Sequence, residues 1–411
     1  MSRSRSHIGN SDHQIDLFAG DTTPESPTMA KSRDNTIEIR GLLNSLDNTE
    51  ALLQHWQQAE WIRPLDVGFA RLIRELSEEQ GEQPDPLVLL LAALTSHQVG
   101  RGHVCIDLGN LLADAGQTLS LPPEESSYQP PKDTDTSETH QPEPAELLAL
   151  VTLSECLALL GASCAVSDGS HTTPLVLNDT RLYLRRFWRY EQCIAEGIRQ
   201  RLALPSSLAD PESGPARTLS RALDQLFQSS EAVDYQKLAC ALAARNRFAV
   251  ITGGPGTGKT TTVVNLLAAL QAVAGESPDR AGRKYRIRLA APTGKAAARL
   301  NESIGGAVSR LPLADLPGNV ELADIPTRVT TLHRLLGRFR HNRDNPLLVD
   351  ILVIDEASMV DVDLMASVFD ALPANAQLIL LGDKDQLASV DAGAVLGELC
   401  QRAFQAHYTP Q

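Results

Sequence analysis

The sequence predicts an α/β fold, in which a mainly α-helical N-terminal domain precedes a domain built on a parallel sheet. Two patterns carry this prediction. In the second half, short continuous apolar runs alternate with helical patterns, which is typical of strands buried on both faces of a parallel sheet. In the first half, apolar residues recur at the spacing of a helix that faces a core. The clearest such run is Leu42, Leu43, Leu46, Leu52, Leu53 and Trp56.

The N-terminal half is not uniform. Residues 1–35 are polar and aperiodic and are predicted to be disordered. Residues 36–204 form the helical domain, with short strands at Leu175–Leu177 and Leu182–Leu184. Within it, residues 122–146 are rich in Pro, Ser, Thr and acidic side chains, so we expect a disordered insert there.

The second domain follows a linker. Residues 205–220 begin with a Pro-, Ser- and Gly-rich stretch, which indicates a domain boundary. Residues 221–411 are then predicted to form the parallel-sheet domain. Its strands are expected at Phe248–Thr252, Ile287–Ala291, Ile351–Ile354 and Leu378–Leu381.

The net charge of −14 is distributed unevenly along the chain. The residues before Tyr235 contain 18 Lys and Arg against 34 Asp and Glu, a charge of −16, whereas the rest contains 19 against 17, a charge of +2. A near-neutral domain is compatible with a local basic groove for nucleic acid, but phosphates would repel the acidic part. We therefore interpret the N-terminal domain as a protein-docking region.

Cysteine usage and hydropathy predict a cytoplasmic location. The six cysteines form no C-x-x-C pair and no zinc spacing, so reduced thiols are expected. No stretch reaches the roughly 18 apolar residues that a membrane helix needs. The basic start of the chain lacks the apolar segment of a signal peptide. We therefore expect no membrane contact.

A phosphate-binding loop follows the first predicted strand of the second domain. Residues 253–260, GGPGTGKT, match the pattern G-x-x-x-x-G-K-[ST] between a strand and a helix. Glycines let backbone N–H groups wrap phosphates, and the helix N-terminus adds positive partial charge. Lys259 is expected to reach the β- and γ-phosphates of ATP, and Thr260 to hold Mg²⁺. The expected nucleotide-binding residues of this loop are Gly253, Gly254, Pro255, Gly256, Thr257, Gly258, Lys259, Thr260 and Thr261.

Two later strand ends carry the other groups that nucleotide hydrolysis needs. Asp355 and Glu356 follow a buried strand, and we expect Asp355 to bind Mg²⁺ and Glu356 to activate the attacking water. Gln386 lies in the polar loop after the last predicted strand, where a neutral amide can sense the γ-phosphate or position water. The predicted catalytic residues are therefore Lys259, Glu356 and Gln386.

Two further junctions suit contacts to single-stranded DNA. Thr293 and Lys295 lie where a predicted strand enters a helix, and backbone amides with polar side chains fit a phosphate there. Thr331 and His333 form a weaker pattern of the same kind. An ordinary helix start is the alternative interpretation of both pairs.

Several segments, taken in order, resemble the RecD family of superfamily 1 helicases, the family of the α subunit of exodeoxyribonuclease V (RecBCD). These segments are Tyr235-Gln236-Lys237, GGPGTGKTTT, APTGKAAARL, TLHRLLG, DEASM and GDKDQLASVDAGAVLGELC. The resemblance is almost continuous from residue 235 to about 400. It is looser over 37–204, where it rests on helix order and on the segment LYLRRFW.

The resemblance implies a RecA-like motor domain and an ATP-dependent helicase or translocase that moves 5′→3′ along DNA. It implies assembly with RecB-like and RecC-like subunits into a heterotrimer that processes double-strand DNA ends for recombinational repair. It also implies that Gln236 recognises the adenine base.

One departure from the family pattern concerns the end of the sequence. RecD-like chains continue into a second RecA-like domain that supplies an arginine finger, whereas this sequence ends at Gln411. From the sequence we therefore expect a truncated chain that is poorly active alone. Two alternatives stay open: a solo RecD-like or conjugative superfamily 1 helicase, and a non-catalytic assembly subunit.

Overall fold

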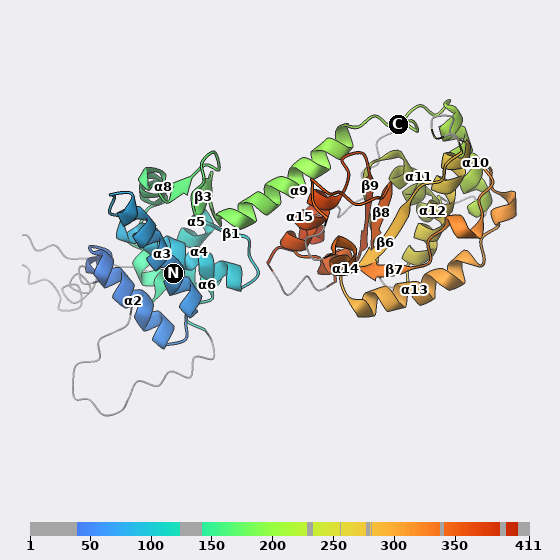
Figure 1. The fold of residues 1–411 in the computed structure, drawn as a ribbon. Helices are drawn as coiled ribbons and strands as arrows, with labels where there is room; N and C mark the ends of the chain where they lie inside the picture. The colour runs from blue at the N-terminus through green and yellow to red at the C-terminus, as the bar shows by residue number, and fades with distance from the viewer. Residues whose placement is uncertain are drawn as a thin grey trace, which may run out of the picture.

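The computed structural model describes residues 39–123, 142–227, 233–254, 256–276, 280, 282–337, 341–386 and 392–401. Two lobes are visible, and a long helix runs from one to the other (Figure 1). The N-terminal lobe is mainly helical, and the second lobe contains a parallel sheet covered by helices. The predicted fold class is therefore confirmed.

The N-terminal lobe combines short helices with one small sheet. Its helices are α2 (Leu46–Gln58), α3 (Pro64–Glu79), α4 (Pro86–Gly100), α5 (Leu108–Ala113), α6 (Ala115–Leu119), α7 (Pro144–Leu148) and α8 (Leu153–Ala162). Its strands are β1 (Cys105–Asp107), β2 (Val166–Ser167), β3 (Leu175–Asn178) and β4 (Arg181–Leu184), in the order β1-β4-β3-β2. The two predicted strands correspond to β3 and β4. β1 and β2 escaped prediction because two or three residues show no alternation.

Helix α4 forms the centre of this lobe. Every residue from Leu87 to Gln98 is buried, and a helix that is apolar all round must be covered on all sides. Asp85 caps its first turn and accepts a hydrogen bond from the Leu87 amide at 2.8 Å, and Pro86 occupies the first helical position. The Asp85-Pro86 pair therefore determines where α4 begins, and the apolar residues that follow explain why α4 lies at the centre of the lobe.

The second lobe contains, in the described part of the chain, a five-stranded parallel sheet in the order β5-β9-β8-β6-β7. The strands are β5 (Phe248–Thr252), β6 (Ile287–Ala291), β7 (Val329–Thr331), β8 (Ile351–Ile354) and β9 (Gln377–Gly382). The helices around it are α9 (Arg185–Ala203), α10 (Gly214–Leu226), α11 (Tyr235–Arg245), α12 (Lys259–Glu276), α13 (Gly294–Val308), α14 (Leu332–Leu336), α15 (Val362–Ala371) and α16 (Val395–Leu399), with short 3-10 turns η2 (Leu313–Asp315), η3 (Leu322–Asp324) and η4 (Ala357–Met359).

The two faces of this sheet have separate cores. Alternate residues such as Leu289, Val353 and Ile379 pack with α10 to α13 on one face. The residues between them, such as Leu352 and Leu380, pack with α9, α14, α15 and α16 on the other. Since successive strand side chains point to opposite faces, a sheet covered on both sides needs continuous apolar strands, and the central strand β8 is apolar and buried throughout.

Helix α9 belongs by its contacts to the second lobe. Phe187 and Ile194 are buried in the same core as α15. Arg201 is only 2% exposed, and its guanidinium donates to the carbonyl oxygens of Leu372 (3.2 Å), Pro373 (3.0 Å) and Ala376 (3.1 Å). These carbonyls follow the C-terminus of α15, where unsatisfied acceptors and negative partial charge favour a cation. Burial lowers the pKa of Arg201 to about 10, so the guanidinium is charged at neutral pH.

The element boundaries differ from the predicted domain plan in three places. α9 lies inside the predicted N-terminal domain 36–204, yet it packs on the second lobe, because an amphipathic helix does not reveal which core it faces. α10 begins at Gly214, inside the predicted linker 205–220. α7 begins at Pro144, inside the predicted insert 122–146, and the Trp56 indole donates to the Pro142 carbonyl at 3.1 Å. Residues 1–35 and 124–141 lie outside the described residues.

The cysteines and the helices bear on the predicted compartment. All six cysteines are free thiols. Burial raises the pKa of Cys240, and that of Cys156 to about 11, so both thiols are protonated at neutral pH. Among the helices that the structure describes, none has the length and apolarity needed to cross a bilayer.

Replacing Arg201 tests the attachment of α9. In Arg201→Met, the buried carbonyls that follow α15 lose their charged hydrogen-bond donor. We therefore expect the free energy of unfolding to fall by about 3 kcal/mol and the melting temperature by roughly 6–12 °C. Arg199→Met is the matched control, because Arg199 lies on the same helix and pairs only with the exposed Glu196. Equal melting temperatures for the two variants would contradict the assigned role of Arg201.

Candidate functional site

All five parallel strands end at one edge of the sheet. The register is aligned there: Thr252 of β5 pairs with Gly382 of β9, and Ala291 of β6 pairs with Thr331 of β7. In sheets of this kind, ligands bind outside the carboxyl ends of the strands, where loops lead into helix N-termini. The edge is therefore the place to look for the predicted site.

Each strand end carries a residue that the sequence singles out. The 253–258 loop follows β5, Gln386 follows β9, and Asp355 follows β8. Thr293 follows β6, and Thr331 is the last residue of β7. In the order of the sheet, the three nucleotide positions are thus neighbours, and the two DNA positions continue the same edge.

The loop after β5 is shaped by glycines. Gly256 and Gly258 have φ values of +76° and +82°, a region that side chains disfavour. The Gly253 amide donates to the Gly382 carbonyl at 3.2 Å, which ties the loop to the end of β9. Pro255 lies outside the described residues. The loop therefore bends tightly before the N-terminus of α12, as a phosphate cradle requires.

Lys259 lies across this loop. Its ammonium donates to the carbonyl oxygens of Gly253 and of Gly254, the latter at 3.0 Å. A cation held over a bent, glycine-rich loop and next to a helix N-terminus offers hydrogen-bond donors and positive charge to phosphate oxygens, which accept. Of the two following hydroxyls, Thr260 is half-buried and Thr261 is exposed.

Gln236 reaches the same loop from another helix. Asp234 caps α11 by accepting from the amides of Gln236 (2.9 Å) and Lys237 (3.1 Å). The Gln236 side chain then donates to the Thr257 carbonyl at 2.9 Å. Gln236, 21 positions away from Thr257 in the sequence, is thereby held beside the loop.

Asp355 directly follows the buried strand β8. Burial raises the pKa of its carboxyl, although the charges of Lys259 and Arg299 act in the opposite direction. The described residues include no group of three or more His, Cys, Asp or Glu that could hold a metal. The donors present are the Asp355 carboxylate and the hydroxyls of the loop, and oxygen donors of this kind are what Mg²⁺ takes from a protein, one or two at a time, alongside phosphates and water.

Glu356 follows Asp355 directly, and Gln386 contacts the turn that begins after Glu356. Glu356 has a φ of +52°, which is unusual for a residue with a side chain and costs about 1–3 kcal/mol. It directly precedes η4, and within η4 the Ser358 hydroxyl donates to the Gln386 side-chain oxygen at 3.3 Å. The two predicted catalytic residues are thus linked through one short turn.

The predicted DNA residues begin two neighbouring helices. The Thr293 hydroxyl accepts from the Ala296 amide at 3.2 Å, and the Thr331 hydroxyl accepts from the Arg334 amide at 3.3 Å. Both threonines are therefore helix caps, as the alternative interpretation expected. Lys295 and His333 are exposed beside them and are available to a ligand.

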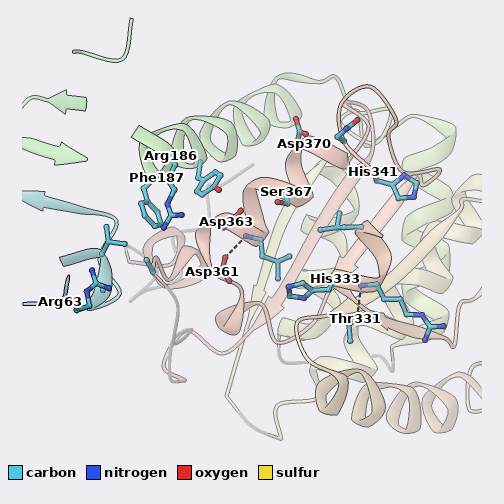
Figure 2. A pocket seen from close by; sticks show the side chains of 18 residues that line it. Arg63, Arg186, Phe187, Thr331, His333, His341, Asp361, Asp363, Ser367 and Asp370 are labelled. Atoms are coloured by element: carbon cyan, nitrogen blue, oxygen red, sulfur yellow. Dashed lines mark hydrogen bonds between the residues drawn. The ribbon is translucent and has the colours of Figure 1, made fainter. Parts of the chain in front are cut away.

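Thr331 and His333 also line an open cavity of about 1310 Å³ between the lobes (Figure 2). Arg186 and Phe187 of α9 and Arg63 of the N-terminal lobe line it as well. The α15 side contributes acidic residues, which are Asp361, Asp363 and Asp370. Because its charges are mixed, the cavity as a whole is not a basic groove. Thr293 and Lys295 are not among its lining residues.

Sequence reasoning missed two residues of this site. Ser358 donates a hydrogen bond to the Gln386 side chain, and the positive charge of Arg299 on α13 opposes the rise in the pKa of Asp355. Ser358 comes three residues after Asp355, inside the DEASM segment, so its proximity to the motif was a usable signal. Arg299 gave no signal, because its relation to Asp355 arises only when β6 and β8 pair.

Comparison with known proteins adds two family matches. Residues 58–183 match the family described as "RecBCD enzyme subunit RecD, N-terminal domain", and residues 236–392 match an "AAA domain". The first match ends two residues before α9, in agreement with the packing of that helix on the second lobe.

Individual relatives agree with these matches. The chain is 36% identical to the RecBCD enzyme subunit RecD of Haemophilus influenzae, over 83% of this chain and 52% of that protein. It is 38% identical to the protein of the same name from Mycolicibacterium smegmatis, over 84% of this chain and 53% of that protein. It is 35% identical to the ATP-dependent RecD2 DNA helicase of Deinococcus radiodurans, over 54% of this chain and 26% of that protein. The chain thus spans about half the length of the RecBCD relatives it matches.

Removing the Lys259 ammonium tests the phosphate site. Charge-assisted hydrogen bonds contribute about 1.5–3 kcal/mol, so Lys259→Ala should weaken nucleotide binding by roughly 10- to 100-fold in calorimetry. Lys295→Ala removes an equivalent charge from the other part of the edge and should leave nucleotide affinity unchanged. Unaltered affinity in Lys259→Ala would exclude the loop as the phosphate site.

Asp355→Asn separates stability from metal binding. Since burial raises the pKa of Asp355, its ionised form is disfavoured in the folded protein at neutral pH. The variant should therefore melt at a higher temperature than the wild type at pH 7 without nucleotide. This advantage should shrink as the pH falls through the raised pKa, where the wild-type carboxyl is protonated.

Although Asp355→Asn should be more stable than the wild type, it should bind nucleotide more weakly. The Mg²⁺-dependent part of the affinity should be lost, because a neutral amide is a poor ligand for a hard cation. Calorimetry with and without Mg²⁺ measures this, and differential scanning calorimetry over a pH series measures stability. A variant that melts below the wild type at pH 7 and keeps its Mg²⁺ dependence would refute both parts.

Proposed function

The chain belongs to the RecD family, and from that premise we propose that it supplies the ATP-binding motor lobe and the docking lobe of an ATP-dependent DNA helicase. The observation that carries the proposal is the shared carboxyl edge of the parallel sheet. Phosphate-binding and acidic residues lie at the ends of β5, β9 and β8, and exposed polar helix starts lie at β6 and β7. One edge can thus bind a nucleotide and a nucleic-acid strand side by side.

The nucleotide contacts follow from this geometry. The 253–258 loop and Lys259 bind the phosphates, and Gln236 contacts the adenine base. Thr260 and Asp355 would hold Mg²⁺, which would supply positive charge that neutralises the phosphates. Glu356 activates the attacking water, and Gln386 senses the γ-phosphate. The contacts of Lys259, Gln236 and Gln386 support these assignments.

The strand of DNA would lie along the other part of the edge. Lys295 and His333 are exposed at the starts of α13 and α14, where backbone amides and positive partial charge suit phosphates. Thr293 and Thr331 cap these helices and contribute by fixing the amides in place. We propose movement in the 5′→3′ direction from the family resemblance alone.

We further propose that the full-length protein works in a RecBCD-type complex with RecB-like and RecC-like subunits, on double-strand DNA ends, in recombinational repair. The names of the relatives support this. Tyr183 and Phe187 of the LYLRRFW segment are buried within this chain and do not offer a docking surface. The exposed leucines of α3, Leu65 at 67% and Leu72 at 43%, are better anchors for a partner. The free cysteines support a reducing compartment such as the cytoplasm.

The alternatives make different predictions about partners. Co-purification of two large subunits from the native source favours the RecBCD-type complex, whereas recovery of the protein alone with helicase activity favours a solo helicase. A complex that assembles normally and keeps its full activity when Lys259 is replaced by Ala favours a non-catalytic assembly subunit.

Binding of single-stranded DNA tests the second half of the edge. Lys295→Ala and His333→Ala should each weaken binding several-fold, and Lys295→Ala should reduce the salt dependence by about one phosphate contact. Fluorescence anisotropy with a labelled oligonucleotide over a salt series measures both effects. Arg310→Ala is the control, because Arg310 is exposed beyond the other end of α13. If Arg310→Ala weakens binding as much as Lys295→Ala, the strand does not lie along this edge.

A further inference from the structure

The two lobes meet at a backbone contact near the nucleotide site. The Gly393 amide, just before α16, donates to the Gly102 carbonyl of the N-terminal lobe at 3.1 Å. On its other side, the same segment accepts from the Val362 amide through the Ala392 carbonyl, at 3.4 Å. The start of α16 is therefore held between the N-terminal lobe and α15.

This contact leaves no room for a side chain. A Cβ atom on Gly393 would lie 2.8 Å from Val104 Cγ1 and 2.9 Å from Val362 Cβ. Gly393 also has a φ of +88°, a conformation that L side chains rarely adopt. Val99 and Val104 pack against the core that contains Val395 and Leu396 of α16. The fit between the lobes is thus close and apolar around one hydrogen bond.

From α16 the packing continues to η4, the short turn that follows Glu356. Leu396 is 1% exposed, and a Cβ atom on Gly382 would lie 2.4 Å from Leu396 Cδ2 and 3.3 Å from the Ser358 amide. Leu396 therefore fills the space between the end of β9 and η4. Ser358 of η4 donates in turn to the Gln386 side chain at 3.3 Å.

We propose that the turn 101–104 of the N-terminal lobe is a positioning element for Gln386. It holds Gly393, and thereby the start of α16, whose Leu396 supports η4 and the Ser358 hydroxyl. The inference rests on the proposed function, since Gln386 is assigned there to the γ-phosphate. It adds that recognition of the γ-phosphate depends on the contact between Gly393 and the N-terminal lobe, although none of the described residues of that lobe is assigned to the nucleotide site.

The contact can be broken from either lobe. Gly393→Ala places a methyl group against Val104, and Val104→Ala removes the apolar contact from the N-terminal side. Gly397→Ala is the matched control, because a Cβ there would meet only Ala394 Cβ at 3.9 Å, an ordinary contact. Gln386→Ala shows the effect of losing the amide itself.

The readout is discrimination between nucleotides by the full 411-residue chain. Affinities for ADP and for a non-hydrolysable ATP analogue are measured by calorimetry with Mg²⁺, and folding is checked by thermal unfolding. In Gln386→Ala, Gly393→Ala and Val104→Ala, the preference for the analogue over ADP should fall by about fivefold or more, the contribution of one hydrogen bond. ADP affinity should stay within about twofold, and Gly397→Ala should match the wild type.

The outcomes separate this inference from the proposed function. If Val104→Ala keeps the wild-type preference while Gln386→Ala loses it, the N-terminal lobe does not position Gln386 and the inference is overturned. If ADP affinity and melting temperature fall together in these variants, the contact only stabilises the fold, and the inference is also overturned. If Gln386→Ala keeps the wild-type preference for the analogue, Gln386 does not sense the γ-phosphate and the inference is overturned. If Lys259→Ala keeps the wild-type affinity for ADP, the 253–258 loop does not bind phosphate and the proposed function is contradicted as well. Should Gly393→Ala fail to fold, Val104→Ala alone decides.

Discussion

The parallel alignment of five strands is the constraint on which the rest of the second lobe depends. Because parallel neighbours need crossover connections, every strand of this sheet ends at the same edge and leads toward a helix or a loop. Backbone amides and positive helix ends therefore collect where the chemistry-bearing residues are. In the proposed function, the sheet order separates two ligands: the residues assigned to the nucleotide follow β5, β9 and β8, while the exposed helix starts assigned to DNA follow β6 and β7.

The sequence predicted this lobe well because its patterns are local. Buried parallel strands are continuous apolar runs, so β5, β6 and β8 have the predicted bounds, and the phosphate loop is a contiguous motif. The missed features are short or long-range. β7 has three residues and shows no pattern of its own. Arg201 looked like any basic residue of an amphipathic helix, since its carbonyl partners lie more than 170 positions away.

Helix α9 shows how such long-range contacts alter the domain plan. The N-terminal family match ends at residue 183, and α9 starts at Arg185. Its apolar side joins the core of the second lobe, and Arg201 binds the carbonyls that follow α15. The N-terminal lobe is consequently attached through a helix that the second lobe holds, and it also touches Gly393 directly. In the part of the chain that the structure describes, this lobe is therefore linked to the second lobe both through α9 and through Gly393.

Hydrogen–deuterium exchange of the full chain, with and without a saturating Mg²⁺–ATP analogue, tests the central claim most directly. Binding at the shared carboxyl edge predicts slower exchange of the amides in residues 253–262 and 355–358, with unchanged exchange in α2 and α3. Protection confined to the N-terminal lobe, or to the sheet edge opposite the phosphate loop, would contradict the account.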